Sequence, residues 1–420
     1  MSGSDSAHAR AVRGLDLMTF FVADVQTGFG PFIAVYLTER RWTQIDIGFA
    51  LSLGTITAMI SQVPAGLLVD WLRSKRLAVG FGISAVSFSA LLFALSPSLL
   101  SVYAAEILHG FASCVLTPAI AAVSLILVGH EALGERLGRN ARFMAIGNGI
   151  AAGVMGVAGS YVSAVSVFWL TAALGVPALF ALSMIGPVMG ESERQEPLDW
   201  RAARGMLTDR RLVIFCGCVF LFHLSNAAVL PIAASEATKT AGGLADIVIA
   251  ASIVLPQGVT ALLSPWVGRR AQIAGRRGML LLGWGSLPLR TALIALFPGA
   301  YALIGLQAIS GMSSAVFGVM MPLIAADLTR RNGRYNLCMG IFGLTVFIGA
   351  TISTSFAGWL ASMAGNTAAF YGLAAAGLAG TLLVWLAMPE TRDGGDGEAM
   401  LPPLSAPSPG GAPLPSPQGS

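Results

Sequence analysis

The sequence predicts an all-α polytopic membrane protein with twelve transmembrane helices arranged as two bundles of six. Hydrophobic residues occupy 55% of the 420 positions and charged residues only 11%, whereas a soluble domain carries about 25% charge. The mean hydropathy is +0.74. Apolar runs of about 20 residues, separated by short charged segments, are typical of a chain that crosses a lipid bilayer many times.

Breaks at glycines, prolines and clusters of charge divide the apolar sequence into segments that can each cross a hydrocarbon core about 30 Å thick. The twelve expected helices span residues 15–37, 45–71, 77–96, 99–128, 143–165, 167–189, 212–236, 246–267, 279–297, 300–327, 337–361 and 368–388. Residues 1–13 are polar, without the features of a cleavable signal, and we expect them to be a cytoplasmic segment.

The loops divide the chain into two halves. We expect one six-helix bundle at residues 14–189 and another at residues 212–388, joined by a cytoplasmic linker at residues 190–211, the longest internal loop. Residues 389–420 hold 8 of the 21 prolines, with serine, glycine and few large apolar residues. That composition cannot bury a core, so we expect a disordered cytoplasmic tail without a site.

The basic residues are distributed unevenly between alternate loops. With the N-terminus inside, 21 of the 25 lysines and arginines fall in cytoplasmic segments, three fall in outer loops, and Arg290 lies within a helix. Cytoplasmic loops of membrane proteins carry such an excess of basic residues. We therefore expect a multi-pass protein of a bacterial cytoplasmic (inner) membrane with both termini in the cytoplasm.

Several function classes lack their sequence features. The chain has no nucleotide-binding loop and no surface set of serine, histidine and aspartate, which argues against an enzyme or an ATP-driven pump. Its basic residues lie in loops between spans, which does not favour nucleic acid as a partner. Cys216 and Cys218 are two residues apart and point to different faces of a helix, so we expect no metal site and no cofactor.

The two halves of the sequence match each other at an offset of 200 or 201 residues. Each match alone is weak, but three pairs of expected helices keep the offset. This regularity indicates a parallel duplication whose halves are related by an axis along the membrane normal. The matching pairs are Gln26 with Asn226, Pro31 with Pro231, Asp46 with Asp246, Glu106 with Gln307, and Gly110 with Gly311.

One short segment carries a family resemblance. "PAGLLVDWLRSKR", residues 64–76, closely resembles the signature between helices 2 and 3 of the major facilitator superfamily, which is glycine, three residues, aspartate and a basic cluster. A weaker copy, "SPWVGRRAQIAGRRG", keeps Gly268 and has Arg270 where the aspartate would stand. The resemblance covers residues 14–388 and implies that family's fold, a small-molecule substrate, secondary transport by alternating access, and a monomer.

The resemblance also implies a cytoplasmic gate, made here by Gly66, Asp70, Arg73, Lys75 and Arg76. Gly66 permits close approach of two helices. Asp70, at a helix end, can accept hydrogen bonds from a neighbouring helix N-terminus and pair with the basic residues. In the family this loop latches the cytoplasmic side of the outward-facing state, and Asp327 is a candidate for its second-half counterpart. The alternative role for these charges is to set the topology only.

Strongly polar residues occur deep inside expected helices, where contact with lipid is costly. In the resembled fold, helices 1, 4, 7 and 10 line a central cavity. Those helices hold most of the deep polar residues, and we expect them to form an aqueous substrate path with the proton-coupling site. The candidates are Asp24, Gln26, Glu106, His109, His223, Asn226 and Gln307.

Asp24 is the most unusual of these residues. It lies near the middle of its helix, about 15 Å from either surface by helix rise, where a carboxylate can load and release a proton or cation. The alternative is a permanent structural pair, for example with Arg290 on helix 9. We expect Arg290 to be a structural counter-charge, although an inward-facing arginine would suit an anionic group.

Two signatures of the family's proton-coupled exporters are missing. Glu106 and His109 stand where their helix 4 has arginine and glutamine, and helix 5 has five glycines but no proline. The leading expectation is still a proton-coupled (or sodium-coupled) exporter of a neutral or cationic amphiphile. The alternatives are an importer or uniporter of a small metabolite, and a non-transporting sensor or scaffold, for which the loops are too short.

Overall fold

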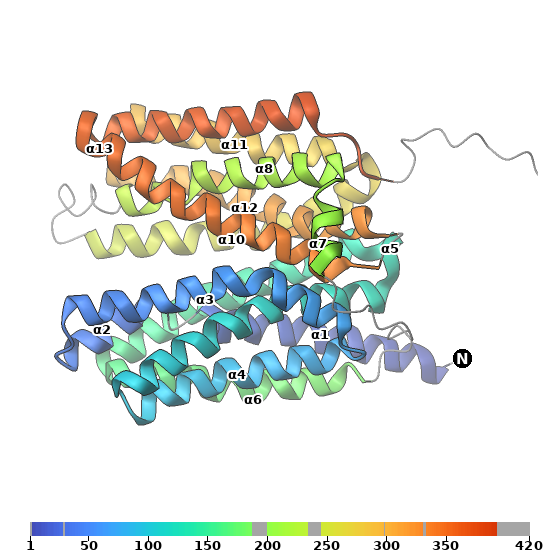
Figure 1. Cartoon of the computed structure of the whole chain (residues 1–420), viewed down its shortest axis with the longest axis horizontal. Helices are drawn as coiled ribbons and strands as arrows, with labels where there is room; N and C mark the ends of the chain where they lie inside the picture. The colour runs from blue at the N-terminus through green and yellow to red at the C-terminus, as the bar shows by residue number, and fades with distance from the viewer. Residues whose placement is uncertain are drawn as a thin grey trace, which may run out of the picture.

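The computed structural model of the protein describes residues 2–27, 30–186, 200–233, 245–297, 299–330 and 333–392, and all regular structure in these ranges is helical. Two groups of nearly parallel helices lie side by side, α1–α6 in one and α8–α13 in the other (Figure 1). The first group comprises α1 (Ser2–Thr27), α2 (Gly30–Glu39), α3 (Gln44–Trp71), α4 (Lys75–Leu95), α5 (Leu99–Tyr161) and α6 (Ala164–Met184).

The second group follows a short helix, α7 (Trp200–Met206), within the expected linker. Its helices are α8 (Arg210–Asn226), α10 (Ala245–Ala274), α11 (Arg276–Leu296), α12 (Ala300–Thr329) and α13 (Tyr335–Ala387). The chain's N-terminus and α7 lie at the same end of the molecule (Figure 1). We call this end, which holds Asp16, Asp70, Arg136 and Asp327, the basic end.

Two very long helices each contain a sharp bend at a glycine. In α5 the bend is at Gly129, with φ 70° and ψ 176°, and in α13 it is at Gly365, with φ 83° and ψ 169°. Glycine suits these positions because positive φ is costly for residues that carry a Cβ. The expected loop at residues 129–142 is therefore wrong, since the chain resumes a helix directly after Gly129 and buries Leu133 and Leu137.

The first expected span also differs from the structure. The polar segment expected at residues 1–13 is helical from Ser2 onward and buries Ala11 against the core. The span expected at 15–37 is divided between α1 and α2. The backbone of Asp24 and Gln26 lies in α1, but their side chains fall outside the described part of the chain, so their proposed role stays a prediction.

Eight helices among the described residues are long and apolar enough to cross a membrane. Two of them, Leu99–Gly159 with 61 residues and Tyr335–Ala387 with 53 residues, contain the bends just described. Each is long enough to cross twice, because about 20 helical residues span the hydrocarbon core. The structure thus supports many membrane crossings, and the count of twelve stays a prediction.

Glycines pack the helices at matching places in the two halves. At each one, an added Cβ would lie closer than 3.0 Å to a backbone carbonyl oxygen of a neighbouring helix. Such contacts let helix backbones approach closely. Because the paired positions differ by 200 to 202 residues, the two halves share their packing as well as their sequence pattern. The pairs are Gly110 on Gly54 with Gly311 on Pro256, Gly147 on Phe20 with Gly349 on Phe220, and Gly66 on Asn336 with Gly268 on Gly134.

Candidate substrate cavity and gate

A cavity of about 270 Å³ lies between the two halves, enclosed by α5, α10, α12 and α13. Its described lining is mostly apolar and contains no charged side chain. The apolar residues include Ile120, Leu137, Met144, Phe317, Met321 and Met339. The polar residues are Thr117, Asn140, Asn148, Gln257, Thr260 and Ser314. A cavity of this kind suits a small molecule with an apolar body and a few polar groups.

Asn140 links this cavity to a buried ion pair. Its Oδ1 accepts from Arg136 Nε at 2.8 Å and from Arg136 Nη2 at 2.6 Å, and its Nδ2 donates to Ser124 Oγ at 2.7 Å. Arg136 also donates to Asp16 Oδ1 at 2.5 Å, and both side chains are nearly inaccessible. Arg139, which is half-exposed, holds the other carboxylate oxygen of Asp16. The Asp16 carboxylate and the Asn140 amide therefore hold the Arg136 side chain next to the cavity.

Sequence reasoning missed this cluster. Arg136, Arg139 and Asn140 fell in an expected loop, and Asp16 fell at the very start of an expected span. The available signal was the spacing of Arg136 and Asn140 at i and i+4, which places them on one face of a helix. In the sequence, Arg136 and Arg139 instead count among the basic residues that mark cytoplasmic loops.

Glu106 lies on α5 but does not line the cavity. It is only 5% exposed, and its Oε1 has no hydrogen-bond partner among the described residues. The carboxyl group packs on Gly54 of α3, where an added Cβ would overlap Oε2. Burying an ionised carboxylate without a donor is costly, so a carboxyl group with an unpartnered oxygen is unusual at this position. His109, one turn further along, is half-buried.

Of the polar candidates in the second half, His223 lies beside a wall of the cavity. The ring of His223 on α8 is 4.8 Å from the ring of Phe317, which lines the cavity. Arg290 on α11 donates from Nη2 to Asn226 Oδ1 at 2.9 Å. The side chain of Arg290 is fully buried, and within the described chain it pairs with this neutral amide and with no carboxylate. Gln307 is also buried, on α12.

Asp70 joins the two halves at the basic end. Its Oδ1 accepts from the backbone N of Asn336 at 3.0 Å and from Asn336 Nδ2 at 2.7 Å, and its Oδ2 accepts from the backbone N of Leu337 at 2.8 Å. These donors form the N-terminus of α13, where the helix dipole favours an anion. Gly66 packs on the carbonyl of Asn336 beside this contact. The geometry is that of a latch, and the latching role stays a prediction.

The basic residues after Asp70 differ from one another. Lys75 is buried, and its Nζ donates to the carbonyl oxygens of Val69, Asp70 and Leu72 at 2.7, 3.0 and 2.7 Å. It therefore caps the C-terminus of α3. Arg73 is exposed and Arg76 half-buried.

In the second half the sequence interpretation needs two corrections. The residue four positions after Gly268, which corresponds to Asp70, is Gln272 and not Arg270. Gln272 Nε2 donates to the carbonyl oxygen of His130 at 3.0 Å and to that of Glu131, both in α5. Asp327 does not join the halves in this way, because it pairs with Arg276 Nε of α11 at 2.9 Å within its own half.

Glu390 lies in the segment that was expected to be a tail without a site. Its carboxylate accepts from the backbone N of Arg276 at 2.8 Å and of Arg277 at 3.1 Å, at the N-terminus of α11. Partial burial raises the pKa of Glu390, but these backbone hydrogen bonds and the Arg276 charge outweigh it, so the net pKa is below its usual range. Residues 389–392 are thus ordered on the bundle.

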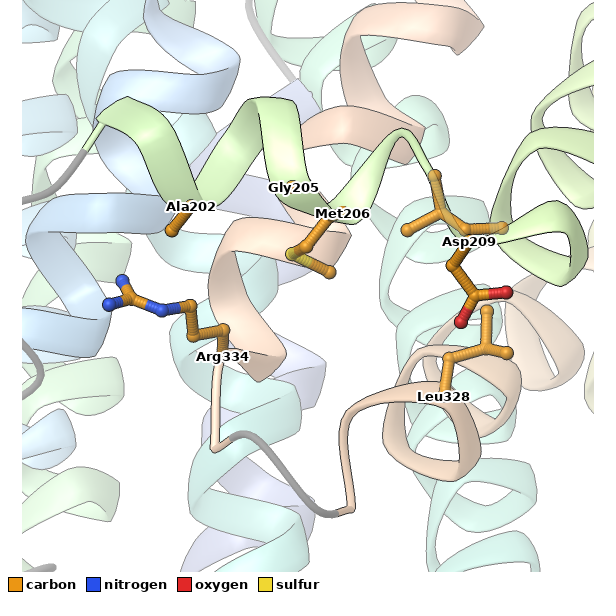
Figure 2. Close-up of a pocket in the computed structure, with 7 residues that line it drawn as sticks. Ala202, Gly205, Met206, Asp209, Leu328 and Arg334 are labelled. Carbon is orange, nitrogen blue, oxygen red and sulfur yellow. The ribbon is translucent and has the colours of Figure 1, made fainter.

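A second pocket, of about 360 Å³, lies under α7 at the basic end. Figure 2 shows the Asp209 carboxylate directed toward Leu328 and the Arg334 side chain extending beneath α7 toward Ala202. Asp209 has a structural role, because its side chain caps α8 by accepting a hydrogen bond from Arg211 N at 2.8 Å. Within the described residues no group of histidines, cysteines and acidic residues could hold a metal ion.

Comparison with known proteins agrees with this architecture. The family profile described as Major Facilitator Superfamily matches residues 15–225 and 213–411. The chain is 35% identical over 402 residues to the uncharacterized MFS-type transporter Rv2456c of Mycobacterium tuberculosis strain H37Rv. The alignment covers 91% of this chain and 94% of that protein. The MFS-type transporter MT2531 of strain CDC 1551 matches to the same extent.

A solved structure shows the same fold. The crystal structure of FucP, a Major Facilitator Superfamily transporter in the outward conformation, superposes with a TM-score of 0.66. The match covers 88% of this chain and 97% of FucP at 17% sequence identity. Similarity at this level concerns the fold and not the substrate.

Proposed function

The chain belongs to the major facilitator superfamily of secondary transporters, and from this premise we propose that it exports a small neutral or cationic amphiphile in exchange for protons. The observation that carries the proposal is the cavity between the halves, with an apolar lining and a few amide and hydroxyl groups. No part of the described lining carries a charge that would demand an ionic substrate.

Alternating access requires that one end of the cavity close while the other opens. At the basic end, glycines of each half pack on backbone carbonyls of the other half, and Asp70 and Gln272 bridge the halves. We take the basic end to be cytoplasmic, because most lysines and arginines are expected in cytoplasmic segments. On this proposal the contacts at the basic end keep the cytoplasmic gate shut.

Glu106 is the described residue best suited to carry the coupled proton. It is buried, acidic and without a donor to its Oε1, so loading and unloading a proton there changes its interaction with the protein strongly. Its contact with Gly54 couples α5 to α3, the helix that bears Asp70. Asp24 remains the second candidate from the sequence.

A test is growth of an efflux-deficient bacterial host on a panel of toxic amphiphiles, with wild type compared to Glu106→Gln. The matched control is Ile107→Ala, at the exposed neighbouring position on the same helix. We expect resistance with wild type and the control, and a loss of at least tenfold in the tolerated concentration with Glu106→Gln. Hypersensitivity of the wild type would instead indicate uptake, and equal growth of all strains would contradict export of those compounds.

A further inference from the structure

We propose that Asn140 is a specificity-determining residue that donates one hydrogen bond from Nδ2 to an acceptor on an uncharged substrate. The inference rests on the proposed function, because it assumes that the cavity between the halves is the substrate site. It narrows the substrate to neutral molecules with an apolar, preferably aromatic, body and a carbonyl or similar acceptor.

The orientation of the Asn140 amide follows from its partners. Both contacts from Arg136 reach Oδ1, and a guanidinium can only donate, so this atom must be the oxygen. The other end of the amide is therefore the NH₂ group, which carries two hydrogens. One of them is used by Ser124 Oγ.

The second hydrogen on Nδ2 has no acceptor among the described residues, although Asn140 is only 5% exposed and lines the cavity. A buried donor without an acceptor costs free energy. A molecule in the cavity that offers an acceptor removes this cost, whereas one without an acceptor leaves it. The amide therefore discriminates between otherwise similar substrates.

The position of the Asn140 amide is fixed by a buried ion pair. Arg136, which holds its oxygen, is itself bound by Asp16, and the Asp16–Arg136 pair is buried on both sides. Rotating the amide would place NH₂ against the guanidinium and leave Arg136 Nε and Nη2 without an acceptor. Arg136 and Asp16 are accordingly positioning residues, and the donor at Asn140 is preorganised.

The charge of the substrate follows from the same arrangement. Arg136 and Arg139 share the Asp16 carboxylate, and Arg139 is half-exposed, so solvent screens the remaining positive charge. A cationic substrate would meet no carboxylate in the described lining, and an anionic one no free cation. Phe317 and three methionines supply polarisable contacts, which favour an aromatic body.

The experiment measures thermal stabilisation of the purified full-length protein by three probes of similar size, namely phenylacetamide, phenethylamine and phenylacetate. A ligand that binds the folded state raises the unfolding temperature according to its affinity. We expect stabilisation of the wild type by phenylacetamide only. Equal or stronger stabilisation by either charged probe, or none by phenylacetamide at millimolar concentration, would overturn the inferred class.

The residue assignment is tested with Asn140→Asp, and Ile107→Ala, at an exposed position of the same helix outside the cavity lining, is the control. The aspartate keeps an acceptor for Arg136 but removes the donor, so we expect at least tenfold weaker apparent affinity for phenylacetamide. Ile107→Ala should bind as the wild type does. Unchanged affinity in Asn140→Asp would overturn the role of Asn140.

Two further measurements keep the tests separate. If Asn140→Asp does not fold, propylbenzene, which lacks the acceptor, is compared with phenylacetamide on the wild type. Stabilisation by both to the same extent would contradict recognition through a donor. Uptake of phenylacetamide into proteoliposomes under a proton gradient tests the transport proposal itself, so binding without transport would refute the proposed function and leave the inference about recognition standing.

Discussion

Asp70 and Gln272 occupy corresponding positions in the two halves, each four residues after a glycine that packs on a carbonyl of the other half. Asp70 accepts three hydrogen bonds at the N-terminus of α13, whereas Gln272 donates to two carbonyl oxygens of α5. Both halves have the contact between a glycine and a backbone carbonyl. The side chain four residues later differs, since it accepts hydrogen bonds in one half and donates them in the other. The glycine contacts therefore determine where the halves pack together. We expect the charge of the side chain to determine how much each contact stabilises that packing.

The difference has a physical consequence. Hydrogen bonds to a charged group contribute about 1.5–3 kcal/mol each, against about 0.5–1.5 kcal/mol for neutral ones, and the α13 dipole adds to the first contact. We therefore infer that the Asp70 side stabilises the closed basic end more than the Gln272 side does.

The largest effect is expected from adding a side-chain carbon to a glycine that packs on a backbone carbonyl of the other half. In Gly66→Ala or Gly268→Ala the new Cβ meets a carbonyl of the other half. Overpacking of about 1–3 kcal/mol would lower the ratio of closed to open molecules by roughly fivefold to 150-fold. Distances between spin labels at the exposed Leu77 and Ile273 measure this ratio.

Gly153→Ala is the matched control for these variants. No atom lies within 4 Å of a Cβ at that position on α5, so its distance distribution should equal that of the wild type. An unchanged distribution in both interface variants would show that the glycine contacts do not determine closure.

A smaller and unequal effect is expected from the side chains. Asp70→Ala should open the basic end more than Gln272→Ala does, by about tenfold in the same ratio, because it removes charge-assisted bonds at a helix N-terminus. The double variant should be close to additive if the two contacts are independent. Equal effects of the two single variants would refute the inferred difference between the halves.

The smallest effect concerns another carboxylate at a helix N-terminus, Glu390 on α11. Its pKa is lowered in the folded protein despite partial burial, mainly by backbone hydrogen bonds. Its contribution to stability is therefore fully present above the unfolded value of about 4.3 and is lost as the pH falls through the lower folded value.

Thermal unfolding of wild type and Glu390→Gln at several pH values checks this expectation. The wild type should be the more stable at neutral pH, with a difference that shrinks only below about pH 4. A difference that disappears on raising the pH would mean that the sign is wrong. Because Glu390 is largely exposed, its effect should be well below that of Asp70.

The sequence by itself determined the membrane class, the duplication and the family. Hydropathy and loop charge depend on composition along the chain, and the signature at residues 64–76 is local, so neither requires knowledge of which helices touch. The contact of Asp70 with a helix N-terminus followed from its place at a helix end. Apart from the duplication, which compares positions about 200 residues apart, these properties are read from residues near one another in the sequence.

Only the tertiary structure decided which polar groups meet. Asn140 reached the cavity because the chain after Gly129 continues as a helix, and Asp16 found Arg136 across 120 positions. Arg290 turned out to face the amide of Asn226. Such partners depend on the rotation of each helix about its axis and on packing at glycines. A hydropathy pattern predicts that a segment is a helix but not which side chains on neighbouring helices meet. The buried polar contacts, and with them the inferred specificity, come from that packing.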